Sequence, residues 1–124
     1  MKRLIAKISV ATWRVLFTIG LISVAVLSLL PAGVATPAFP HSDKFAHLIA
    51  YSALGFTGAA SFSRHKQRLV ITLVTCGALI ELLQGLTPTR EMEVLDFLAN
   101  TVGVLVGVFV AKIIFTESNV LNTP

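Results

Sequence analysis

Four long apolar runs constrain what this chain of 124 residues can fold into. Short segments separate the runs and hold most of the proline, lysine and arginine residues. Hydrophobic residues make up 55% of the chain and charged residues only 13%, whereas roughly a quarter of a soluble domain is charged. Apolar runs of this length indicate helices that cross a membrane. The sequence therefore predicts an all-α integral membrane protein, a four-helix bundle that forms a single domain over residues 1–124.

The four runs predict helices at about residues 13–30, 43–63, 69–86 and 94–115. The basic residues of the amino-terminal segment, of the loop 64–68 and of Lys112 then fall on one side of the membrane. Because lysine and arginine are enriched in cytoplasmic segments, this pattern places both termini in the cytoplasm. It explains the net charge of +4 without a nucleic-acid partner. We expect a multi-pass protein of the bacterial cytoplasmic (inner) membrane.

The first run has a second interpretation. A basic start, an apolar run and the small residues Gly33-Val34-Ala35 are also typical of a signal peptide. The uncharged run from Val15 to Leu30 exceeds the usual signal-peptide core of about 7 to 15 residues. We therefore expect the first helix to be retained. The single cysteine, Cys76, excludes an intramolecular disulfide framework and a cysteine-based zinc site.

The third run is too short to cross a membrane on its apolar residues alone. From Leu69 to Ile80, a helix rises about 18 Å, against a hydrocarbon core of about 30 Å. The helix can cross only if Glu81 and Gln84 also lie inside the membrane. Because polar groups in hydrocarbon need partners, these two residues should face polar side chains of other helices.

The second and fourth helices supply such partners. Asp43, His47 and Tyr51 follow a spacing of four residues, so they share one face of the second helix. Asp96 and Asn100 share a face of the fourth helix in the same way. The helical rise per residue places all of these side chains in the outer part of the membrane.

The stripe on the fourth helix continues into Gly103 and Gly107, a Gly-x-x-x-Gly pattern that allows two helices to approach closely. The sequence thus predicts a tight bundle that opens into an outward-facing polar pocket.

These residues suggest chemistry but do not define it. We predict His47, Glu81 and Asp96 as acid and base groups or as a polar core, and we predict ligand-binding roles for Asp43, Lys44, Tyr51, Gln84, Arg90 and Asn100. Lys44 and Arg90 would contact anionic groups. His47 with Glu81 or Asp96 could also form a nitrogen and oxygen metal set, but no HExxH or other ligand spacing is present. We therefore predict no metal and no cofactor.

The combined motifs resemble a known family. They are Asp43-Lys44-x-x-His47-x-x-x-Tyr51, Glu81-x-x-Gln84, Pro88-x-Arg90 and Asp96-x-x-x-Asn100-x-x-Gly103. Together they are similar to the VanZ-like family of small bacterial membrane proteins, over residues 43–107. The resemblance implies a four-helix membrane protein, and the family's namesake is associated with low-level resistance to the glycopeptide teicoplanin. The acidic segment Glu91-Met92-Glu93 departs from what we expect of the family's outer loop.

Three functions follow as hypotheses. The first is binding of a cell-envelope lipid or peptidoglycan-precursor headgroup in the polar pocket, with a link to glycopeptide resistance. The second is a membrane-embedded hydrolase or transferase that acts on a lipid headgroup. The third is a structural or partner-binding bundle, because interhelical hydrogen bonds alone also explain buried polar residues. The expected partners are membrane lipids and lipid-linked envelope precursors, and the sequence leaves the oligomeric state open.

Overall fold

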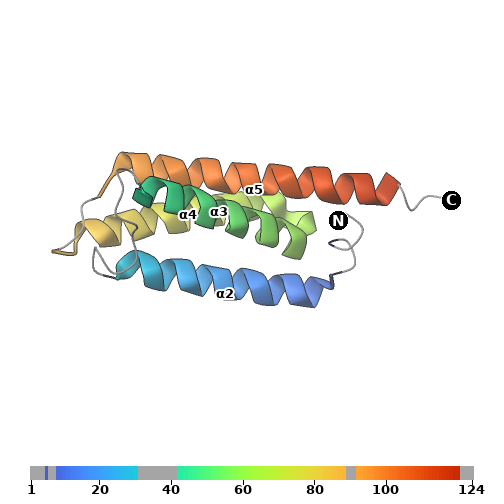
Figure 1. Ribbon diagram of the computed structural model, residues 1–124, viewed down its shortest axis with the longest axis horizontal. Coiled ribbons are helices and arrows are strands. Elements are labelled where there is room, and N and C mark those ends of the chain that lie inside the picture. Colours follow the sequence, from blue (N-terminus) through green and yellow to red (C-terminus); the bar gives the residue numbers. More distant parts are fainter. Residues whose placement is uncertain (1–4, 6–7, 31–41, 89–91, 121–124) are drawn as a thin grey trace.

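The computed structural model describes residues 5, 8–30, 42–88 and 92–120. Within these ranges the chain forms the helices α2 (Val10–Leu29), α3 (Ser42–Ser61), α4 (Lys66–Gly85) and α5 (Val94–Val120), with the short 3₁₀ helix η1 (Ser63–His65) before α4. The four α-helices lie lengthwise side by side, and each runs antiparallel to the next along the chain (Figure 1). No described residue belongs to a strand. The predicted all-α four-helix bundle is therefore confirmed.

Helix α3 makes the most extensive contacts in the bundle, because it packs along α5 and also against α2 and α4. Within the described part of the chain, three segments are long and apolar enough to cross a membrane, namely Val10–Leu29, Ser63–Gly85 and Val94–Phe115. Helix α3 is less apolar because it carries the polar stripe, and its neighbours cover much of its surface. Membrane crossing by α3 and the cytoplasmic location of the termini stay predictions.

Three helix boundaries differ by three residues or more from those expected. Helix α2 begins at Val10, before the expected start at about residue 13. Helix α4 begins at Lys66, three residues before Leu69, because the 3₁₀ turn η1 leads directly into it. Helix α5 continues to Val120, beyond the expected end at residue 115. No glycine or proline interrupts the chain between Val108 and Val120, so nothing in the sequence breaks the helix where its residues become polar.

Helices α3 and α5 form the closest contact in the bundle through small residues. A Cβ atom added to Gly103 would lie 2.6 Å from the carbonyl oxygen of Leu48, and one added to Gly107 would overlap the carbonyl oxygen of Ser52. Gly55 faces Val104 of α5 in the same manner. The predicted close helix approach is therefore found, and its partner is α3.

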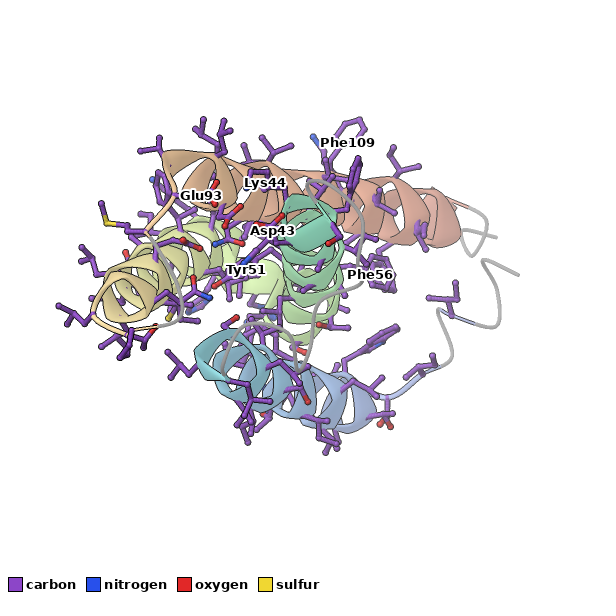
Figure 2. All side chains as sticks on the ribbon, turned by 60° about the vertical axis from the view of Figure 1, so that its left-hand side comes forward. Asp43, Lys44, Tyr51, Phe56, Glu93 and Phe109 are labelled. Carbon is purple, nitrogen blue, oxygen red and sulfur yellow. The ribbon has the colours of Figure 1, made fainter. Side chains whose placement is uncertain are left out.

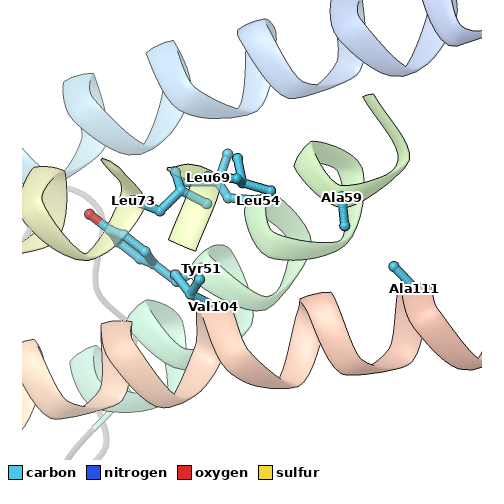
Figure 3. Close-up of a cluster of buried hydrophobic side chains, with 7 residues drawn as sticks. All are labelled: Tyr51, Leu54, Ala59, Leu69, Leu73, Val104 and Ala111. Atoms are coloured by element: carbon cyan, nitrogen blue, oxygen red, sulfur yellow. The ribbon is translucent and has the colours of Figure 1, made fainter. Parts of the chain in front are cut away.

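The hydrophobic core lies directly beside this α3–α5 contact. Figure 3 shows Tyr51, Leu54 and Val104 together, with Leu69 and Leu73 of α4 completing the cluster. Helix α2 joins the bundle through Trp13, whose ring packs edge-on against Phe56 at a centroid distance of 5.5 Å. The core thus packs the middle of α3 and α5 against the first turns of α4.

Candidate functional site

Acidic side chains gather at the end of the bundle where α3 and α5 begin and α4 ends (Figure 2). Asp43 lies in the first turn of α3 and Asp96 in the first turn of α5, where the helix dipole favours negative charge. Glu93 directly precedes α5, and Glu81 lies about one turn before the end of α4. We use the name polar cluster for the residues that meet here: Asp43, Lys44, His47, Glu81, Glu93, Asp96 and Asn100.

Asn100 connects three helices within the polar cluster. Its side-chain oxygen Oδ1 lies 3.0 Å from Nδ1 of His47 on α3, and its Nδ2 donates to Oε1 of Glu81 on α4 at 3.3 Å. Because an ionised carboxylate only accepts hydrogen bonds, the amide nitrogen faces Glu81 and the amide oxygen faces His47. Nδ1 of His47 is then the donor, which in a neutral imidazole makes Nε2 the acceptor.

Lys44 connects the first turn of α3 to the start of α5. Its ammonium nitrogen lies 2.6 Å from Oε2 of Glu93 and 3.1 Å from Oδ1 of Asp96. It also lies 3.1 Å from Oδ2 of the adjacent Asp43. Figure 2 shows Lys44 beside Asp43 and Glu93. The sequence suggested that Lys44 binds an anionic ligand. In the structure, three carboxylates already surround its positive charge.

Glu81 is the least compensated acid of the cluster. Its exposed fraction is only 3%, and no lysine or arginine in the described ranges forms an ion pair with it. Oε1 accepts the hydrogen bond from Asn100, whereas Oε2 accepts none from any described residue. Oδ1 of Asp96 also accepts no hydrogen bond there, but it has the ion pair with Lys44. Glu81 thus has one carboxylate oxygen that is buried and has no hydrogen-bond partner among the described residues.

Two described residues that the sequence suggested for ligand binding do not join these contacts in the structure. Gln84 points to a different helix, where its Nε2 donates to the backbone oxygen of Ser28 on α2 at 2.7 Å. Tyr51 lies below the cluster with its ring in the hydrophobic core (Figure 3). Arg90 lies outside the described residues. In the structure Gln84 thus bonds to α2 and Tyr51 packs in the core, and their ligand-binding roles stay predictions.

Glu93 was not among the predicted site residues. Its backbone oxygen accepts hydrogen bonds from the amides of Asp96 and Phe97, and its side chain pairs with Lys44. Glu93 therefore lies at the amino-terminal end of α5, directly before Val94 and about one turn before Asp96. The spacing of three residues between these two acids was the available signal, because residues three apart share a face of a helix.

A pocket of about 260 Å³ lies between α4 and α5 beside the cluster. Its walls are almost wholly apolar, and they consist of Ala78, Glu81, Leu82, Met92, Glu93, Val94 and Phe97. Leu82 and Val94 are exposed on the bundle surface. Glu81 lines this pocket and also belongs to the polar cluster. The site thus combines a buried polar centre with an apolar side opening.

Two kinds of chemistry are available to this arrangement. His47 with its free lone pair and the buried Glu81 could exchange a proton with a bound group. In addition, one ring nitrogen of His47 and one carboxylate oxygen each of Glu81 and Asp96 lie within 4.8 Å of one another. Imidazole nitrogen and carboxylate oxygen are ligands of divalent metal ions.

The fold and the site define a class, a small helical membrane protein with a buried polar cluster at one end of the bundle. The sequence model of the family described as VanZ/LLP1 matches residues 4–115, and the chain belongs to this family. The resemblance to the VanZ-like family is therefore confirmed. No curated protein and no solved structure matches the chain.

Proposed function

We propose that the polar cluster binds the headgroup of a cell-envelope lipid, which includes lipid-linked peptidoglycan precursors. The position of Glu81 carries this proposal, because its side chain joins the polar cluster and lines the apolar pocket between α4 and α5. A lipid likewise consists of a polar headgroup joined directly to an apolar hydrocarbon chain. Its headgroup would bind at the cluster while its hydrocarbon chain lies in the pocket, where burial of apolar surface favours it.

Different headgroup atoms would bind different members of the cluster. The free Oε2 of Glu81 can accept a hydrogen bond from a headgroup hydroxyl, amide or amine. An anionic headgroup oxygen would bind Lys44 by displacing Glu93, whose side chain is the most exposed of the three carboxylates around Lys44, at 46%. Arg90 is proposed as a second contact for the anionic group, as its sequence position suggests.

The distribution of charge supports an outward-facing cluster. The other described basic residues, Arg14, Arg64, Lys66, Arg68 and Lys112, belong to the opposite half of the bundle. Basic residues are enriched on the cytoplasmic side. We propose that the chain works in the bacterial cytoplasmic membrane with its cluster toward the cell envelope. Sequestration or turnover of an envelope lipid there would connect it to glycopeptide resistance.

Mass spectrometry of lipids that copurify with the protein tests this proposal. Val94→Trp fills the apolar pocket without touching the ion pairs and hydrogen bonds of the cluster, whereas Leu105→Trp adds the same side chain to an exposed position on α5 outside the pocket. We expect a headgroup-selective lipid with wild type and Leu105→Trp, and a loss of at least tenfold with Val94→Trp. Equal lipid content in all three proteins would overturn the proposal.

The second candidate function is a membrane-embedded hydrolase or transferase. It is favoured by Asn100, which orients His47 and Glu81 on the same amide group and thereby holds a candidate acid and base together. The same lipid analysis separates this function from simple binding. Turnover would release a modified lipid with wild type, while Glu81→Gln would retain the lipid and release none.

A further inference from the structure

We infer that His47, Glu81 and Asp96 form a binding site for a divalent first-row transition-metal ion, with zinc as the first candidate. One potential ligand atom of each residue lies within 4.8 Å of the others. Ligand atoms on one zinc ion lie about 3 to 4 Å apart, given bonds of about 2.0 to 2.2 Å. Side-chain rotations that move these atoms by about an ångström would therefore complete the set.

The free oxygen of Glu81 is an independent indication of a ligand. The Glu81 side chain is 97% buried, since its exposed fraction is 3%, and Oε2 has no hydrogen-bond partner among the described residues. A buried carboxylate oxygen without a partner is unfavourable unless a cation or a donor compensates it. Glu81 belongs to the set of three ligand atoms, so a metal ion bound there would supply this compensation.

Asn100 prepares two of the three ligands for a metal ion. Metal-binding histidines commonly donate their second ring nitrogen to a neighbouring oxygen, which fixes the tautomer and the ring orientation. Nδ1 of His47 makes this contact with Asn100 at 3.0 Å and leaves the lone pair on Nε2. The same amide holds Oε1 of Glu81, so that Oε2 remains for the ion.

The charges of the cluster also favour a divalent cation. Four described carboxylates meet one described ammonium group, that of Lys44. Lys44 makes its shortest contact with Glu93, at 2.6 Å, and contacts Asp43 and Asp96 at 3.1 Å each, whereas no described lysine or arginine pairs with Glu81. A divalent ion between Glu81 and Asp96 would neutralise the two most deeply buried acids, at exposed fractions of 3% and 6%.

The ligand types indicate which ion is preferred. Magnesium and calcium prefer sets made only of oxygen. An imidazole nitrogen with two carboxylates suits zinc, and also manganese or iron(II). With three protein ligands, a zinc ion keeps a fourth position open, as in catalytic sites. That position could bind a phosphate oxygen of a lipid headgroup, and only this last step rests on the proposed function.

Metal analysis of the purified wild-type protein tests the inference without any lipid. The protein is loaded with Zn²⁺ in detergent, freed of excess metal, and analysed by mass spectrometry for zinc per chain. We expect about one zinc ion per chain for wild type, and less than a tenth of that for His47→Gln and Glu81→Gln. Glu93→Gln is the matched control, because Glu93 belongs to the cluster and, with Asp43 and Asp96, to a second candidate acidic set. It should retain about one ion.

Titration of the wild-type protein with Co²⁺ gives a second readout that does not depend on whether the variants fold. We expect visible absorption bands of a protein-bound ion that saturate at one equivalent and disappear when Zn²⁺ is added. The inference would be overturned if the wild-type protein bound no stoichiometric zinc and showed no absorption bands of bound cobalt. It would also be overturned by full zinc loading of folded His47→Gln, or by loss of zinc in Glu93→Gln alone. Metal binding without selective lipid binding would refute only the proposed function. Selective lipid binding without metal binding would refute only the metal site.

Discussion

At the scale of single residues, Asn100 determines the geometry of the polar cluster. Its side chain is completely buried and is the only described group that contacts both His47 and Glu81 by hydrogen bonds. Asn100 also lies against Gly77 of α4. A Cβ atom added to Gly77 would lie 3.3 Å from the Cβ atom of Asn100. An amide in this position can satisfy a donor and an acceptor at once, which no apolar side chain of similar volume can do.

We therefore predict that Asn100→Leu destabilises the bundle by about 1 to 3 kcal/mol, the cost of leaving buried polar partners unsatisfied. Thr101→Val is the matched control, since the Thr101 hydroxyl only donates to the backbone of its own helix. Thermal unfolding in detergent measures both. If Asn100→Leu unfolded at the same temperature as Thr101→Val, the hydrogen bonds of Asn100 would not hold the cluster together.

At the scale of helices, the packing of α3 on α5 positions the cluster. Glycines allow the backbones to meet, and the polar residues one to three turns away then come within hydrogen-bond distance. The Gly-x-x-x-Gly spacing predicted a close helix contact because only small residues permit it. It could not identify α3 as the partner, since Gly20 on α2 and Gly77 on α4 offer small residues as Gly55 on α3 does.

Gly107→Ala should cost about 1 to 3 kcal/mol of stability, as expected for an overpacked contact. The added methyl group would meet the backbone of Ser52 and Phe56, which cannot rotate away. Gly20→Ala on α2 is the control, because its methyl group would meet only the end of the Leu54 side chain, at 3.2 Å. Comparable unfolding temperatures of the two variants in detergent would contradict the proposed tightness of the α3–α5 contact.

The candidate site could be predicted from the sequence only in part. The short third apolar run required Glu81 to lie in the bundle, and helical spacing placed His47 and Asn100 on matching faces. Gln84 shares that depth with Glu81, but it faces α2, because three residues along a helix turn the side chain away by tens of degrees. The role of Glu93 depended on where α5 begins, and helix ends are the least certain part of such predictions.

At the scale of the whole molecule, charge divides the bundle into two halves. Acidic residues surround Lys44 at the end of the bundle where α3 and α5 begin. The other described arginine and lysine residues lie toward the opposite end, where α2 and α4 begin. The all-α bundle was predictable from composition and from the lengths of the apolar runs. The metal site that we propose was not predictable from the sequence, because its candidate ligands come one each from three helices and leave no spacing motif.

The proposed function requires that the polar cluster is a working site in the cell envelope and more than a set of hydrogen bonds between helices. We would test it with bacterial cells that express wild type, Glu81→Gln or Asp96→Asn. Susceptibility to envelope antibiotics, glycopeptides included, is measured together with the amount of each protein in the membrane. We predict that both variants reach wild-type abundance and lose the wild-type effect on susceptibility. Loss of the effect in proportion to a loss of protein would contradict the claim, because the cluster would then serve only to hold the bundle together.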